Sequence, residues 1–213
     1  MPKPHEALAS YMAEDKNFRG IGTALATRLS DRFGRYLRDA LSECHSDIIE
    51  ILGHDVAEAT FATFETKSHE AVLIEWLEDR GVIEAVGIRT AVRIARCWGK
   101  EGSIAIKNNP YLLTAFLPWP SVDKVGEALG IGSDDQRRAA AAVESALYDL
   151  LDRNHTLIKE RDIAAGVAKL LNSAATSADP NATRPIDAAV ASGGACRLSN
   201  GVQPFGAALM EET

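Results

Sequence analysis

Cysteine and histidine are scarce in this sequence, and neither type is clustered. The 213 residues include three cysteines, at positions 44, 97 and 196, and five histidines that each stand alone. The Cys-x-x-Cys and His-x-x-x-His spacings typical of zinc sites do not occur. Acidic residues flank His45, but a solvated helix face explains that cluster better than a metal site does. Widely spaced cysteines without a pairing pattern predict a reducing, intracellular compartment.

Long apolar runs are also missing. No stretch approaches the ~18 apolar residues that a membrane-spanning helix needs. The first ten residues, MPKPHEALAS, lack the apolar core of a signal peptide. The sequence therefore predicts a cytoplasmic protein that has no membrane partner.

The common catalytic signatures are absent from the chain. It contains neither the nucleotide-binding run G-x-x-x-x-G-K-[ST] nor the G-x-S-x-G turn of serine hydrolases. No aspartate or lysine stands out as a candidate for glycosylase chemistry. We expect no catalytic residue, no metal and no cofactor in this chain.

The charge balance is acidic, with a formal net charge of −7 and a hydrophobic content of 46%. That hydrophobic content is ordinary for a globular protein and supports a real core. The acidic balance argues against a protein that coats nucleic acid over its whole surface. Any basic surface must therefore be local.

The most informative stretch is FRGIGTALATRLSDRFG, residues 18–34, where a Gly-Ile-Gly turn separates two helical patterns. Gly20 and Gly22 permit a tight turn, because glycine adopts positive φ without a Cβ clash. The turn exposes backbone N–H groups at the start of the next helix, where the helix dipole favours an anion. This pattern is typical of a helix-hairpin-helix motif, which grips the DNA backbone, although a plain interhelical turn has the same form. The predicted DNA-binding residues of this hairpin are Arg19, Gly20, Ile21, Gly22, Thr23, Arg28 and Arg32.

Similar segments recur along the chain. Turn positions at residues 22, 53, 87 and 118 are each followed twelve residues later by the end of a helical pattern, which predicts repeats of ~32 residues. Residues 87–100 contain four basic residues and no acid, so Arg89 and Arg93 form the second predicted DNA contact. A solvated helix face is the alternative for those arginines. Residues 53–66 are acidic, and Pro118 and Pro120 remove N–H donors from the last turn, so these two hairpins are predicted to be structural.

The rest of the chain predicts helices and a small β-hairpin. Residues 134–154 give the longest helix pattern, with Ser133 or Asp134 as the cap, and residues 160–171 give another helix. Asn200-Gly201 is the preferred sequence of a type I′ hairpin turn. The predicted fold is therefore mostly α. Tandem helix-hairpin-helix units fill residues 1–132, and residues 133–213 form a long helix and a winged-helix-like end with a C-terminal β-hairpin.

These features, in this order, resemble the N-terminal region of RecD-like superfamily 1 DNA helicases, which are related to TraA-like conjugative proteins and to exodeoxyribonuclease V alpha-subunit-like proteins. The similar stretches are FRGIGTALATRLSDRFG, LSECHSDIIEILG, IRTAVRIARCWGKEGSIAIKNNPYLL, SVDKVGEALGI, HTLIKERDIAAGVAKLL and ACRLSNGVQPF. They cover nearly the whole chain. The family has a Gly-x-Gly turn where this chain has residues 53–55 and 118–120.

The resemblance implies a non-catalytic accessory region that binds DNA without reading its sequence, in DNA repair or recombination. In that family an ATP-dependent helicase motor follows this region, so DNA and a downstream motor domain are the expected partners. A helical scaffold whose acidic surface docks a partner protein or its own motor is the alternative. A stand-alone winged-helix regulator is disfavoured, because no basic recognition helix accompanies the β-hairpin.

Overall fold

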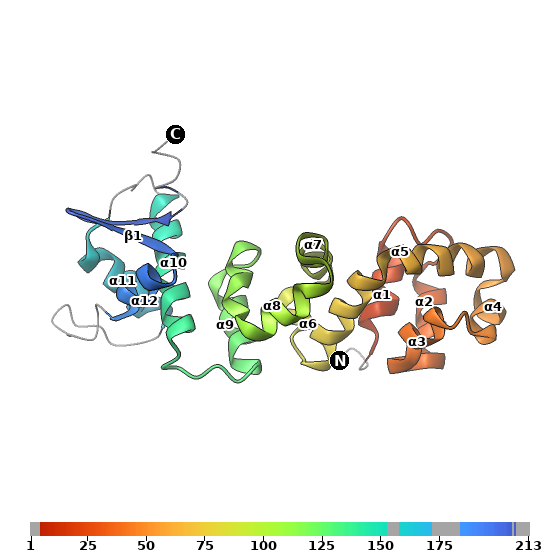
Figure 1. The fold of residues 1–213 in the computed structure, drawn as a ribbon. Helices are drawn as coiled ribbons and strands as arrows, with labels where there is room; N and C mark the ends of the chain where they lie inside the picture. The colour runs from red at the N-terminus through yellow and green to blue at the C-terminus, as the bar shows by residue number, and fades with distance from the viewer. Residues whose placement is uncertain (1–4, 153–157, 172–183, 206, 208–213) are drawn as a thin grey trace. The chain divides into compact units, whose positions relative to one another are not determined.

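The computed structural model describes residues 5–152, 158–171, 184–205 and 207 (Figure 1). The chain is mostly helical, with one two-stranded antiparallel sheet, so the predicted fold class is confirmed. Its backbone forms two compact units, residues 1–108 and 109–213. The domain boundary expected from sequence was 24 residues later, after residue 132, and the functional division of the chain remains a prediction. No helix among the described residues is long and apolar enough to cross a membrane.

The first unit consists of helices and two short 3-10 turns, η1 and η2. In order they are α1 (Ala7–Glu14), α2 (Thr23–Phe33), η1 (Gly34–Tyr36), α3 (Leu37–Ser42), α4 (Ser46–Leu52), α5 (His54–Asp79), α6 (Ile83–Val86), α7 (Ile88–Trp98), η2 (Gly99–Glu101) and α8 (Gly102–Asn108). The helix α5, with 26 residues, runs through this unit and packs against α1, α3, α4, α7 and α8.

The length of α5 corrects two expectations. The sequence predicts a separate hairpin at residues 53–66 and its longest helix at residues 134–154. Instead one helix runs from His54 to Asp79, while α10 (Gln136–Leu151) has 16 residues. Between residues 54 and 79 there is neither glycine nor proline, so nothing in the backbone ends the helix.

The repeat is longer than predicted. Elements of a second copy begin 65 residues after their counterparts: α2 and α7 at 23 and 88, η1 and η2 at 34 and 99, α3 and α8 at 37 and 102, and α5 and α9 at 54 and 119. Gly34 and Gly99 end equivalent helices with nearly the same backbone angles, φ 51° and ψ −127° against φ 56° and ψ −135°. Leu29 and Ile94 are equivalent and fully buried. The ~32-residue period therefore describes half of a 65-residue double hairpin.

The second unit contains η3 (Pro110–Ala115), α9 (Trp119–Ala128), α10 (Gln136–Leu151), α11 (Glu160–Leu170), α12 (Arg184–Ala191), β1 (Ala195–Leu198) and β2 (Gly201–Pro204). The helix α10 packs against α11 and α12. Arg197 on β1 donates hydrogen bonds to Glu160 and Asp187, both at 2.8 Å, which ties the β-hairpin to α11 and α12.

Two local predictions in this unit need correction. Leu198 pairs with Gly201, so the loop residues are Ser199 and Asn200, and Gly201 is already in a strand. Asn200 and Gly201 do not have positive φ, so the turn is not type I′. The cap of α10 is Asp135, whose carboxylate accepts a hydrogen bond from the amide of Arg137 at 2.8 Å.

The segment NPYLL, residues 109–113, is held in place by one buried tyrosine, Tyr111. Asn109 accepts a hydrogen bond from the Tyr111 amide at 3.1 Å and so begins η3. The Tyr111 ring stacks on Trp119, with centroids 5.8 Å apart, and its hydroxyl donates to Asp123. A Cβ at Gly126 would lie 2.6 Å from the Tyr111 hydroxyl oxygen, so only glycine fits at this point of α9.

We therefore expect Gly126→Ala to destabilise the second unit by about 2 kcal/mol, because a methyl group would be forced into packed aromatic side chains. Urea unfolding followed by tryptophan fluorescence measures this loss. Gly132→Ala is the matched control, since nothing lies within 4 Å of a Cβ at that position. Equal stability of the two variants would show that Tyr111 can move aside.

Candidate nucleic-acid interface

The first hairpin turn is anchored by two apolar side chains and exposed between them. Phe18 and Ile21 are buried, whereas Arg19, Gly20 and Gly22 are exposed. Gly20 has φ +88°, and a Cβ there would lie 3.1 Å from a methyl group of Val56. The turn therefore packs closely on α5 while its polar edge faces solvent.

The amide end of α2 is open. Gly22 is the N-cap, with extended backbone and no side chain to accept a hydrogen bond. Among the described residues no other side chain accepts from the first amides of this helix, and Thr23 and Ala24 are exposed. Free N–H groups at the positive end of a helix dipole attract an anion.

The predicted arginines of this hairpin are not equivalent. Within the described part of the chain, Arg19 and Arg28 have no acidic partner. Arg32 lies in the last turn of α2 and forms an ion pair with Asp47. The structure therefore places Arg19 in the turn and Arg28 in the second turn of α2, but Arg32 at the far end of the helix with its charge partly neutralised.

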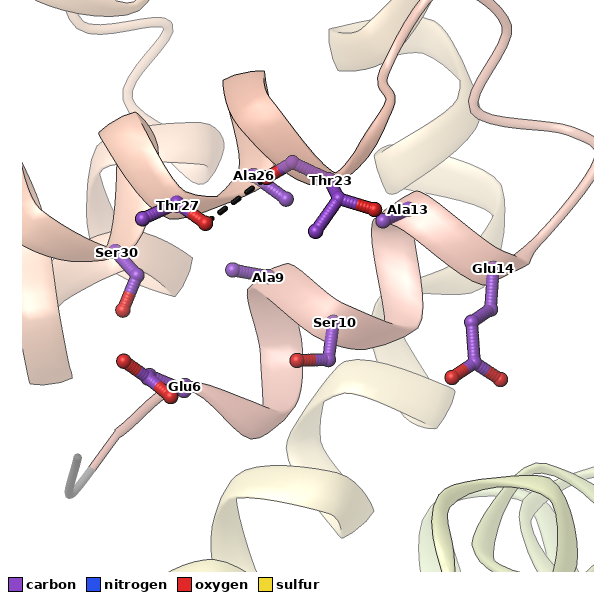
Figure 2. A pocket seen from close by; sticks show the side chains of 9 residues that line it. All are labelled: Glu6, Ala9, Ser10, Ala13, Glu14, Thr23, Ala26, Thr27 and Ser30. Atoms are coloured by element: carbon purple, nitrogen blue, oxygen red, sulfur yellow. Dashed lines mark hydrogen bonds between the residues drawn. The ribbon is translucent and has the colours of Figure 1, made fainter. Parts of the chain in front are cut away.

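A shallow groove of about 150 Å³ lies between α1 and α2, beside Thr23 (Figure 2). Its lining is small or acidic: Glu6, Ala9, Ser10, Ala13, Glu14, Thr23, Ala26, Thr27 and Ser30. The Thr27 hydroxyl donates to the Thr23 carbonyl at 2.9 Å. With two carboxylates and no basic side chain, this groove is a poor place for a phosphate, so the anion site is limited to the exposed turn.

The second predicted contact shares the uncapped helix end and the exposed arginine of the first, but its turn is Ala85-Val86-Gly87 instead of Gly-x-Gly. Gly87, the counterpart of Gly22, caps α7 at φ +79° without a side-chain hydrogen bond. Arg93 is the counterpart of Arg28, and both are exposed. Arg89 is 93% exposed and lies 3.7 Å from a carboxylate oxygen of Glu14, a loose contact that bound phosphate could replace.

Comparison with known protein families matches part of the chain. Residues 65–157 match the family model described as the helix-hairpin-helix domain of ATP-dependent RecD2 DNA helicase. The chain contains a RecD-like helix-hairpin-helix region. The match includes Gly87 and Arg93, whereas the first hairpin lies outside it. No curated protein and no solved structure matches the chain significantly.

One turn of the RecD-like region was missed by the sequence reasoning. Gly130-Ile131-Gly132 repeats the Gly-Ile-Gly of residues 20–22, and Gly130 has φ +83° against +88° for Gly20. The repeated tripeptide was the signal that could have revealed it. Here, however, α10 begins three residues further on, behind the carboxylate of Asp135. That carboxylate occupies the helix amides, so this turn is closed to phosphate.

The fourth predicted hairpin is also occupied by its own side chains. Pro118 caps α9, Trp119 is buried, and its indole N–H donates to the Leu170 carbonyl at 3.1 Å. Arg138 forms a bidentate pair with Asp123, at 2.8 Å for both contacts. These contacts fit the structural role that the sequence predicts for this hairpin.

A buried polar network joins the two candidate hairpins of the first unit. The Glu70 side chain, on α5, accepts hydrogen bonds from the Tyr11 hydroxyl and from Arg96 Nε at 3.0 Å. Lys67 lies 2.9 Å from Asp15, at the start of the first turn, and 3.4 Å from Glu70. The network therefore links α1, the first turn, α5 and α7.

The network shifts the pKa values of several of its own members. Burial, followed by the hydrogen bond to Glu70, raises the pKa of Tyr11, and the hydrogen bond to Glu70 raises that of Arg96. Burial alone would raise the pKa of Asp15, but hydrogen bonds from Asn17 and Lys67 lower it to about 2. Tyr11 thus stays neutral, and Asp15 and Arg96 stay charged, throughout the physiological pH range.

We expect Glu70→Ala to cost about 3 kcal/mol of unfolding free energy, because it removes the acceptor of the buried Tyr11 hydroxyl and one of the two carboxylates beside Lys67. Glu58→Ala removes a 79% exposed carboxylate from the same helix and should change stability little. Chemical unfolding of both variants tests this. A loss no greater than that of the control would mean that solvent replaces Glu70 readily.

The surroundings of a second carboxyl group on α5, that of Glu75, disfavour its charged form. Burial raises the pKa of Glu75 to about 7, although Arg38, at 3.1 Å, opposes that rise. Neighbouring Asp39, Glu78 and Asp79 raise it further. A carboxyl whose pKa is higher in the folded state binds more protons when folded, so its contribution to stability is lost as pH rises.

The protein should therefore lose stability between about pH 4.5 and pH 7, and Glu75→Gln should flatten that part of the profile. At pH 8 the variant should be the more stable of the two, whereas at pH 4 they should be similar. Thermal unfolding at several pH values measures the difference. Parallel profiles of wild type and variant would show that Glu75 is not the responsible group.

Proposed function

We propose that this chain is the DNA-binding accessory region of a RecD-like ATP-dependent helicase, and that it grips the DNA backbone without reading sequence. The observation that carries the proposal is the pair of uncapped helix ends at Gly22 and Gly87. They lie 65 residues apart in a repeat, and each is followed by an exposed arginine at the same position, Arg28 or Arg93.

Two open helix ends fit a chain of phosphates better than a single anion. Each end supplies backbone N–H donors and a positive dipole, which act on any phosphate regardless of the base attached to it. Arg19 and Arg28 add charge at the first end, and Arg89 and Arg93 at the second. The network around Glu70 holds both hairpins against α5, so the distance between the two contacts is set before DNA arrives.

The helicase context is part of the proposal. The match to the RecD2 helix-hairpin-helix domain supports it, and the chain has no nucleotide-binding run of its own. The region would hold DNA for a motor domain that follows it, in the cytoplasm, during repair or recombination. The acidic net charge of −7 favours a second candidate, a scaffold that docks a partner or the motor through protein contacts.

The double substitution R19E/R28E should weaken binding to a fluorescein-labelled duplex about tenfold at low salt, because two phosphate contacts become repulsive. It should also reduce the salt dependence of the affinity. Fluorescence anisotropy over a salt series measures both effects.

Arg161→Glu is the control, because Arg161 is 72% exposed in the second unit, outside both hairpins. Equal affinity of R19E/R28E and R161E would reject the first hairpin as a DNA contact. Wild-type protein that neither binds DNA nor is retained on heparin would favour the protein scaffold.

A further inference from the structure

The helices α2 and α7 have a second pair of equivalent ends, opposite to the amide ends discussed above. Each helix has 11 residues and is therefore ~16 Å long. At these carboxyl ends, η1 and η2 approach the exposed face of α5. The surface there contains aromatic side chains that the phosphate contacts do not use.

Two hollows line this face of α5. One, of about 260 Å³, includes Tyr36 from η1 and Trp76 from α5 in its walls; the other, of about 200 Å³, includes Lys100 from η2. Val72 lines both hollows and is 41% exposed. We call this surface, formed by Tyr36, Val72, Trp76, Arg35, Arg80 and Lys100, the aromatic groove.

The Tyr36 ring is exposed, the Trp76 ring is half-buried, and each has a guanidinium group beside it. Tyr36 is 64% exposed, a high fraction for a large aromatic side chain. The guanidinium of Arg35 lies 5.8 Å from the centre of the Tyr36 ring, and that of Arg80 lies 5.0 Å from the centre of the Trp76 ring. Among the described residues, Arg35, Arg80 and Lys100 have no acidic partner.

Three acids of the larger hollow have close partners, whereas Asp79, 51% exposed, lies 3.8 Å from His5 Nδ1. Arg38 pairs with Asp39 at 3.2 Å and with Glu75 at 3.1 Å. Glu78 accepts hydrogen bonds from the amides of residues 6 and 7, at 2.9 and 3.0 Å. The charge of these carboxylates, with the negative dipole end of α2, repels a phosphate from the interior of this hollow. Carboxylate oxygens can instead accept hydrogen bonds from the N–H groups of an uncharged ring.

We infer that the aromatic groove binds single-stranded nucleic acid, with bases entering against Tyr36 and Trp76 and phosphates at Arg35, Arg80 and Lys100. Bases stack on aromatic rings whatever their sequence, and a basic rim follows the backbone. In a duplex the bases are paired and stacked on one another, so they cannot enter. The inference deepens the proposed function, on which it rests, by assigning strand preference to a different surface of the same unit.

The test compares a fluorescein-labelled thymidine oligonucleotide with a duplex of the same length, using the full chain. Tyr36→Ala should weaken single-strand binding about fivefold or more, the loss expected when one base loses its aromatic partner, while duplex affinity stays unchanged. Tyr36→Phe keeps the ring and should bind within twofold of wild type. Tyr148→Ala, at a tyrosine 44% exposed in the second unit, is the matched control.

A second measurement does not depend on affinity. Photo-crosslinking of an iododeoxyuridine oligonucleotide should label the peptide that contains Tyr36 or Trp76, and excess unlabelled duplex should compete poorly. Unchanged single-strand affinity of Tyr36→Ala, or equal losses on both DNAs, would overturn the inference. If R19E/R28E loses duplex binding while Tyr36→Ala is silent, the proposed function stands and the groove fails; the opposite pattern rejects the hairpin contact alone.

Discussion

The buried carboxylate of Glu70 is the contact on which the first unit depends. It lies 3% exposed in the middle of α5, where an unpaired charge would be strongly unfavourable. Tyr11, Lys67 and Arg96 satisfy it, and they come from α1, from α5 itself and from α7. Because a buried ion needs all its partners in place, the relative positions of these helices are restricted to one arrangement. Apolar packing alone, which tolerates small shifts, would define that arrangement less sharply.

This restriction connects the fold to both proposed surfaces. The amide ends of α2 and α7 present backbone donors, and the carboxyl ends bring η1 and η2 to the face of α5. In the two proposals, the same two helices therefore serve phosphates at one end and bases at the other. Both surfaces depend on glycine at helix ends, since Gly34, Gly87 and Gly99 have positive φ that side chains rarely adopt.

Sequence reasoning recovered the fold class, the first hairpin turn and the RecD-like resemblance, because glycine positions and apolar spacing are local signals. It did not find that α5 is continuous, since the acidic stretch after Gly53 resembled a separate hairpin. Nor did it find the Arg32–Asp47 pair or the Glu70 network, whose members lie far apart in sequence and meet only after packing. Gly130-Ile131-Gly132 shows that a local signal can also mislead. It is the same tripeptide as the first turn, but an aspartate a few residues later closes it.

The helix α5 belongs to both copies of the repeat. Its first ten residues, 54–63, stand 65 positions before α9, and its last eight, 72–79, stand 65 positions after α1. One helix thus ends the first copy and begins the second. In ordinary helical arrays a whole copy can be gained or lost during evolution at a loop. Here it cannot, because the boundary between the two copies lies inside a continuous helix. The number of hairpins is therefore fixed by a shared helix, and the amide ends of α2 and α7 can diverge in charge while their spacing is inherited unchanged.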